Sequence, residues 1–162
     1  MRLQNIRFPE PDICREEELY FHRNGEWIDF NGYFNLFYIE KRKKYTNQET
    51  LTLHLEVGDC QAVRLMHDET MIREIELSGQ PEPLTLEFPY QETDKGVFWF
   101  SVKPGISSKS DVTQLSGWYE GKCQEEKPVR IAAVVCTFKR EPYVLRNLKS
   151  VLRFLERPEN AS

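Results

Sequence analysis

The residues best suited to hold a ligand form a short loop, Cys136 to Glu141, that follows an apolar run. The loop offers the hydroxyl of Thr137, the ring of Phe138 and the cations Lys139 and Arg140. It contains no glycine, whereas the usual dinucleotide and ATP loops need glycines so that backbone N–H groups can approach phosphates. The loop would stand at the carboxyl end of a parallel strand, where open α/β sheets place ligands. The alternative interpretation makes Phe138 a core aromatic and Lys139-Arg140 the solvated start of a helix.

Two expected elements position this loop. Residues 129–135 are almost continuously apolar, which is typical of a fully buried parallel strand. Pro142 suits the first turn of a helix, and a helix from about residue 142 to 156 is predicted by a stripe of four leucines: Leu145, Leu148, Leu152 and Leu155. Strand, loop and helix would open an α/β sheet. One such unit cannot cover both faces of its strand, so we expect the leucine stripe to lack its normal partners.

Residues 1 to about 125 instead show the period of two that belongs to β-strands. The clearest strand is Thr50 to Val57, in which leucines and a valine alternate with polar residues. The other expected strands are Gln61 to Met66, Ile72 to Leu77, Leu84 to Phe88, Val97 to Val102 and Leu115 to Tyr119. These short strands predict a mainly β domain, a jelly-roll-like antiparallel β-sandwich, with no helix before residue 142. The charged stretch Glu120 to Pro128 is the expected linker, so we divide the chain into residues 1–125 and residues 126–162.

Aromatic side chains cluster in the N-terminal part of the expected sandwich. Six of them fall within twelve residues: Trp27, Phe30, Tyr33, Phe34, Phe37 and Tyr38. Exposed rings of this kind can bind the apolar faces of sugars, and Trp99 and Trp118 are weaker candidates for the same role. We favour the interpretation that alternate members of the cluster fill the core.

Other residues capable of chemistry have simpler explanations. His22, His54 and His67 do not have the spacing of metal ligands, so we expect no metal site. The basic run Lys41 to Lys44 could contact an anionic lipid carrier or a polyphosphate. A solvated loop or a strand edge guarded by lysines is the interpretation we favour for that run.

Composition restricts the class of protein further. The net charge of −4 over 162 residues argues against non-specific binding to nucleic acid or to an anionic membrane. No stretch is long and apolar enough to cross a bilayer, and the first residues lack the apolar core of a signal peptide. The four cysteines, at positions 14, 60, 123 and 136, form no C-x-x-C pair and are expected to be reduced thiols. We therefore expect a cytoplasmic location, which includes the inner face of the membrane.

The order of these parts resembles bacterial glycosyltransferases of the family 2 type, and most closely the galactofuranosyltransferases of cell-wall galactan synthesis. In the loop, the resemblance rests on Thr137-Phe138-Lys139-Arg140. In the expected sandwich it rests on four patches: Tyr33-Phe34-Asn35, Lys44-Tyr45-Thr46, the strand Leu51 to Val57, and Gly117-Trp118. In that family an N-terminal β-sandwich precedes a GT-A catalytic domain.

The resemblance implies a site and an activity. Thr137 and Phe138 would line the base pocket of a UDP-sugar, and Arg140 would hydrogen-bond to the nucleotide. The complete enzyme would transfer a sugar to a growing glycan or a lipid-linked acceptor. The subfamily that the chain resembles most implies galactofuranose as that sugar. It would use Mn²⁺ or Mg²⁺ held by a D-x-D motif, which these 162 residues do not contain. Catalytic residues would lie beyond residue 162, so this chain alone is expected to be inactive.

Two other functions stay open from the residues alone. The sandwich could be a non-catalytic carbohydrate-binding module. It could equally be an oligomerisation module that forms contacts between copies of the chain.

Overall fold

The computed structural model describes residues 1–12, 14–105, 115–123 and 141–155. The chain divides into two compact units, Met1–Glu125 and Glu126–Ser162. The expected strand over 129–135 lies outside the described residues. In the second unit the described element is one helix, α2 (Glu141–Leu155). This helix confirms the one expected from about residue 142 to 156, with Pro142 in its first turn.

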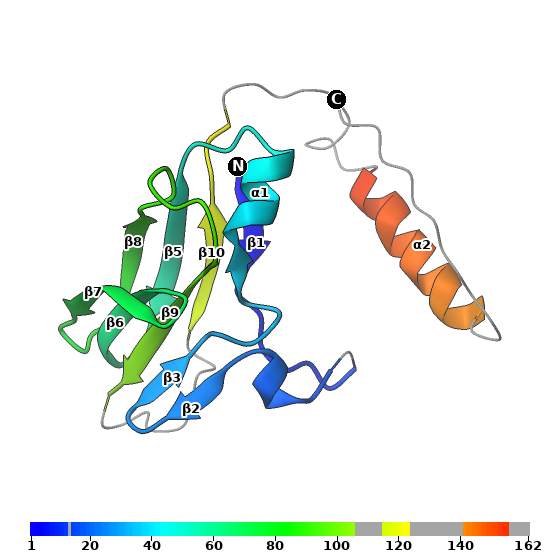
Figure 1. Cartoon of the computed structure of the whole chain (residues 1–162). Helices are drawn as coiled ribbons and strands as arrows, with labels where there is room; N and C mark the ends of the chain where they lie inside the picture. Colours follow the sequence, from blue (N-terminus) through cyan, green and yellow to red (C-terminus); the bar gives the residue numbers. More distant parts are fainter. Residues whose placement is uncertain (13, 106–114, 124–140, 156–162) are drawn as a thin grey trace. The chain divides into compact units, whose positions relative to one another are not determined.

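The first unit is built from two antiparallel sheets (Figure 1). One sheet has the order β1 (Arg2–Asn5), β10 (Ser116–Glu120), β5 (Leu51–Val57) and β8 (Glu82–Phe88). The other has the order β2 (His22–Asn24), β3 (Trp27–Asp29), β9 (Val97–Pro104), β6 (Cys60–His67) and β7 (Thr70–Glu76), and β4 (Phe37–Tyr38) also pairs with β9. Successive strands β7, β8, β9 and β10 alternate between the two sheets, as in double-sheet jelly rolls.

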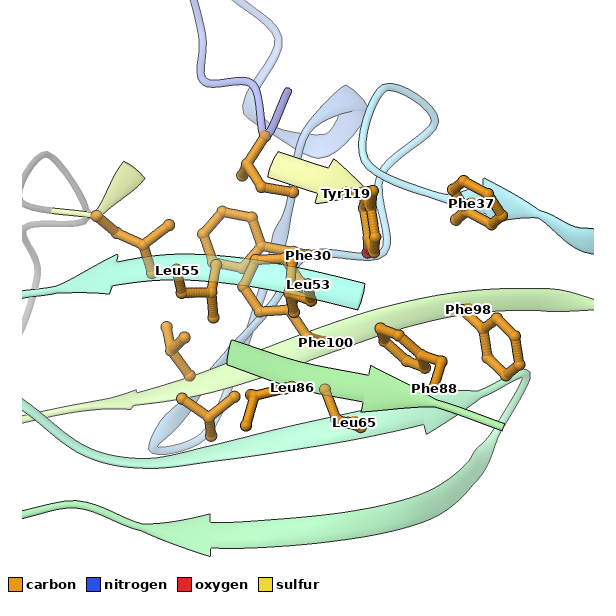
Figure 2. Close-up of a cluster of buried hydrophobic side chains, with 14 of the residues drawn as sticks. Phe30, Phe37, Leu53, Leu55, Leu65, Leu86, Phe88, Phe98, Phe100 and Tyr119 are labelled. Atoms are coloured by element: carbon orange, nitrogen blue, oxygen red, sulfur yellow. The ribbon is translucent and has the colours of Figure 1, made fainter. Parts of the chain in front are cut away.

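The inner faces of the two sheets share one hydrophobic core (Figure 2). In β5 the residues Leu51, Leu53, Leu55 and Val57 are buried while the residues between them are not, which is the alternation that the sequence predicts. Phe98 and Phe100 of β9 face the same core and are fully buried. This part of the structure confirms the mainly β, antiparallel character of the chain.

The expectation of no helix before residue 142 is wrong. A short 3₁₀ helix, η1, covers Glu17–Leu19, and a two-turn α-helix, α1, covers Ile39–Tyr45. The basic run Lys41 to Lys44 therefore lies on a helix rather than on a loop or a strand edge. Its lysines and arginine are good helix formers, and basic residues in the last turn interact favourably with the helix dipole. Among the described residues, no helix is long and apolar enough to cross a membrane.

Candidate functional site

The predicted nucleotide residues Thr137, Phe138 and Arg140 lie outside the described residues, so their role stays a prediction. The helix that follows them is described, and it presents a row of apolar side chains. Leu145, Leu148 and Leu152 are 58%, 39% and 56% exposed. Exposed leucines in a row on one helix face indicate a surface that another element normally covers.

The Tyr33-Phe34-Asn35 patch has a structural role. Asn35 is fully buried, and its side-chain oxygen accepts a hydrogen bond of 2.8 Å from the backbone N–H of Arg7. Its amide nitrogen donates to the backbone carbonyls of Arg7 at 2.9 Å and Tyr20 at 2.8 Å. One side chain therefore fixes three backbone groups from two separate segments. Asn35 therefore has a structural role in the sandwich.

Gly117 has a similar explanation. A Cβ atom at this position would lie 2.5 Å from the backbone oxygen of His54 on the neighbouring strand β5. Only glycine lets β10 approach β5 this closely without a shift of one strand. Gly117 is therefore another residue that the fold requires.

Its neighbour Trp118 forms a stack of three side chains on the outer face of the four-stranded sheet. The His54 ring stacks on the indole with centroids 4.9 Å apart, and the Arg2 guanidinium lies 4.1 Å from the indole centroid. His54 comes from β5 and Arg2 from β1, the strands on opposite sides of β10. The two side chains therefore cover the two faces of the indole. A sugar could stack on Trp118 only by displacing one of them.

The N-terminal aromatic cluster contains both core and surface side chains, as the favoured interpretation of the sequence predicts. Phe30 and Phe37 are buried in the core, and Phe34 packs against it. Tyr33 is 66% exposed and Tyr38 36% exposed. Trp99, the other tryptophan considered for sugar binding, is 8% exposed and donates its indole N–H to the carbonyl of Asp68 at 2.7 Å.

Trp27 is half-buried and borders a surface hollow. The Arg64 guanidinium lies 3.6 Å from its ring centroid, and Arg64 also pairs with Glu74 at 2.7 Å. Beside the ring is a hollow of about 480 Å³. Its lining includes the Lys103–Glu26 ion pair, whose nitrogen and oxygen are 2.8 Å apart. An aromatic ring bordered by charged hydrogen-bonding groups could hold a small polar ligand.

Helix α1 presents a second candidate surface. Ile39 is fully buried beneath the helix, whereas Tyr38, Lys41, Lys44 and Tyr45 are all exposed. The spacing of Lys41, Lys44 and Tyr45 places them on one side of the helix once the helix is known. The pairing of Arg64 with Trp27 joins two distant segments, so no local pattern could have revealed it.

The remaining polar groups show ordinary structural roles. The Nδ1 atom of His22 lies 2.6 Å from the side-chain oxygen of Asn31. The Nε2 atom of His67 lies 2.9 Å from the carbonyl oxygen of Lys95. Within the described ranges, no group of three His, Cys, Asp or Glu residues has metal-binding geometry. The three described cysteines, at positions 14, 60 and 123, are free thiols. Burial, with a smaller effect of Asp59, raises the pKa of Cys60 to about 11, so this thiol stays protonated at neutral pH.

No family model and no curated protein matches this chain.

Proposed function

We propose that this chain is the N-terminal part of a bacterial glycosyltransferase of the family 2 type. The complete enzyme would transfer a sugar from a UDP-sugar to a growing cell-surface glycan, and the sandwich would be its non-catalytic N-terminal domain. The observation that carries the proposal is the exposed row Leu145, Leu148 and Leu152 on α2. A helix of this kind follows the first strand of an α/β domain and packs its apolar face on the sheet.

Two further features support this proposal. A β-sandwich unit precedes the unit that contains α2, which is the domain order of the family that the sequence resembles. Asn35 and Gly117, two residues of that resemblance, have fold-determining roles in the sandwich.

The proposed chemistry belongs to the loop before α2. Arg140 would supply a charge-assisted, bidentate contact to the nucleotide, and Phe138 would pack on the base. The divalent metal would stabilise the departing diphosphate when bound. These 162 residues contain no D-x-D sequence, so its ligands would come from a part of the protein after Ser162.

The test uses the gene product that includes the residues following Ser162, titrated with UDP by calorimetry. Arg140→Ala should raise the Kd for UDP roughly 10- to 100-fold, because hydrogen bonds to charged groups contribute about 1.5–3 kcal/mol. Lys139→Ala is the matched control and should change the Kd much less. Equal effects of the two substitutions would contradict the assigned role of Arg140. Micromolar UDP binding by the 162-residue chain alone would contradict the proposal as a whole.

The hollow beside Trp27 favours a second candidate, a carbohydrate-binding module. The discriminating experiment titrates the 162-residue chain with cell-surface oligosaccharides. Saturable binding that Trp27→Ala abolishes and Trp118→Ala leaves intact would favour this alternative. Retention by both variants would exclude the hollow as the sugar site.

A further inference from the structure

Helix α1 carries a strong local charge in a protein whose net charge has the opposite sign. Its seven residues include four basic side chains and one acidic side chain, whereas the whole chain has a net charge of −4. Such a concentration attracts anions locally even though the molecule as a whole repels them.

The geometry of α1 places part of this charge on one outward surface. Lys44 and Tyr45 stand three and four residues after Lys41, so these three residues share one side of the helix. Tyr38 directly precedes the helix, and the Lys41 ammonium lies 5.3 Å from the centroid of its ring. All four are exposed. We call these four residues the α1 outer face. The opposite side is fixed to the sandwich by the fully buried Ile39, whose backbone N–H donates to the carbonyl of Gly96 at 3.1 Å.

The other basic residues of α1 are engaged in the fold. Lys43 pairs with Asp94 at 3.0 Å and donates to the carbonyl of Gln91 at 3.0 Å. Arg42 lies over the ring of Phe37, with the guanidinium 5.2 Å from its centroid. These contacts anchor the helix, so they hold the outer face in a fixed orientation.

Lys41 and Lys44 are the cations that stay available. Their contacts are with the rings of Tyr38 and Tyr45, at 5.3 Å and 5.2 Å, and neither forms an ion pair with a described residue. The acidic residue of the helix, Glu40, stands four residues before Lys44, on the same side of the helix, and about a quarter turn from Lys41. One carboxylate therefore lies beside two lysines, which leaves this surface with a net positive charge. The outer face therefore combines two available ammonium groups with two exposed phenol rings.

We propose that the α1 outer face binds the surface of an anionic lipid bilayer. Lysines near such a surface are attracted by its negative potential, and tyrosine rings favour the level of the headgroups because they are apolar with one polar end. A soluble polyphosphate would use the two lysines but would gain little from the exposed tyrosines. The α1 outer face shares no residue with the nucleotide loop, so this proposal goes beyond the proposed transferase activity and does not depend on it.

The test is co-sedimentation of the 162-residue chain with vesicles. We expect binding to vesicles in which about a third of the phosphatidylcholine is replaced by phosphatidylglycerol, and much weaker binding to phosphatidylcholine alone. Lys41→Gln with Lys44→Gln should lower the partition coefficient roughly 25-fold, since each lysine near the surface contributes about fivefold. Tyr45→Ala should lower it as well, with unchanged salt dependence.

The matched control replaces two exposed cations on other parts of the sandwich, Arg15→Gln with Arg73→Gln, and should bind like the unaltered chain. Circular dichroism of each variant checks that the sandwich remains folded. Equal loss in the control pair would overturn the assignment to α1. Binding that does not depend on the anionic lipid would also overturn it, as would full displacement from vesicles by micromolar tripolyphosphate, which would assign the face to a soluble polyanion.

Discussion

At the scale of single residues, Asn35 is a buried polar side chain that holds separate segments of the sandwich together. It is fully buried, and it bonds to backbone groups of Arg7 and Tyr20, which belong to segments far from it in the sequence. Replacing it leaves those groups without partners in a place that water reaches poorly. Unsatisfied groups of this kind cost more than the hydrogen bonds themselves contribute.

We therefore expect Asn35→Ala to lower the free energy of unfolding by roughly 2–4 kcal/mol. Urea denaturation followed by tryptophan fluorescence measures this change. Asn47→Ala, at an exposed position of the same unit, is the control and should change the free energy by less than about 0.5 kcal/mol. A similar small effect at Asn35 would mean that the observed hydrogen bonds do not hold these segments together.

Tyr119 presents the opposite case, a buried polar group without a protein partner. Its hydroxyl forms no hydrogen bond with any described residue, and its ring packs 5.3 Å from that of Phe37. Burial raises the pKa of Tyr119 well above its usual value, because the ionised form would lose its solvation. Tyr119→Phe should therefore raise the free energy of unfolding at neutral pH by about 1 kcal/mol.

The same residue predicts a pH dependence. Above about pH 10 the unfolded chain releases the tyrosine proton while the folded chain keeps it, so stability falls as the pH rises. The decline in stability with pH should be smaller in Tyr119→Phe. Part of the decline should persist in that variant, because burial also raises the pKa of Tyr90. Urea denaturation across the alkaline range tests this, with exposed Tyr33→Phe as the control. A Tyr119→Phe variant less stable than the unaltered chain at neutral pH would contradict the prediction and would indicate a buried water bound to the hydroxyl.

At the scale of elements, the sequence predicts the helices and strands that span several periods of their hydrophobic pattern. The alternation in β5 and the leucine stripe of α2 span several periods, and the structure has these elements close to the expected bounds. Strand β9 is also found close to its expected bounds, although residues on both of its faces are buried. By contrast, β2, β3 and β4 have two or three residues each. Such short strands form because β9 pairs with β3 and β4, which no local pattern encodes.

Helix α1 cannot be predicted from the sequence for a related reason. Its seven residues are shorter than the window over which a helical period can be recognised, and a helix of this length is not stable alone. The contacts of Ile39 with the core and of Lys43 with Asp94 hold it in place. The two candidate surfaces differ in the same respect. The spacing of Tyr38, Lys41 and Tyr45 can be read once the helix is known, whereas the approach of Arg64 to Trp27 depends on the sheet.

At the scale of the whole molecule, the two units differ in how completely their apolar residues are covered. Every described residue of the hydrophobic core lies between Ile6 and Tyr119, inside the unit Met1–Glu125. The apolar row of α2 in the other unit is exposed. The sandwich should therefore fold by itself, while the exposed leucines should promote association between copies of the chain.

We accordingly expect a chain that ends at Lys127 to keep a single cooperative thermal transition with a Tm close to that of the 162-residue chain, because its core is complete. Its solubility should be higher, and light scattering at high concentration should be lower, because the row Leu145, Leu148 and Leu152 has been removed. Replacing Leu145 and Leu152 by lysine in the 162-residue chain is the matched control, since it removes the apolar row without shortening the protein. That variant should gain solubility to a similar degree. Loss of the cooperative transition in the shortened chain would show that the residues after 127 complete the core of the sandwich, and the boundary between the units would then be wrong.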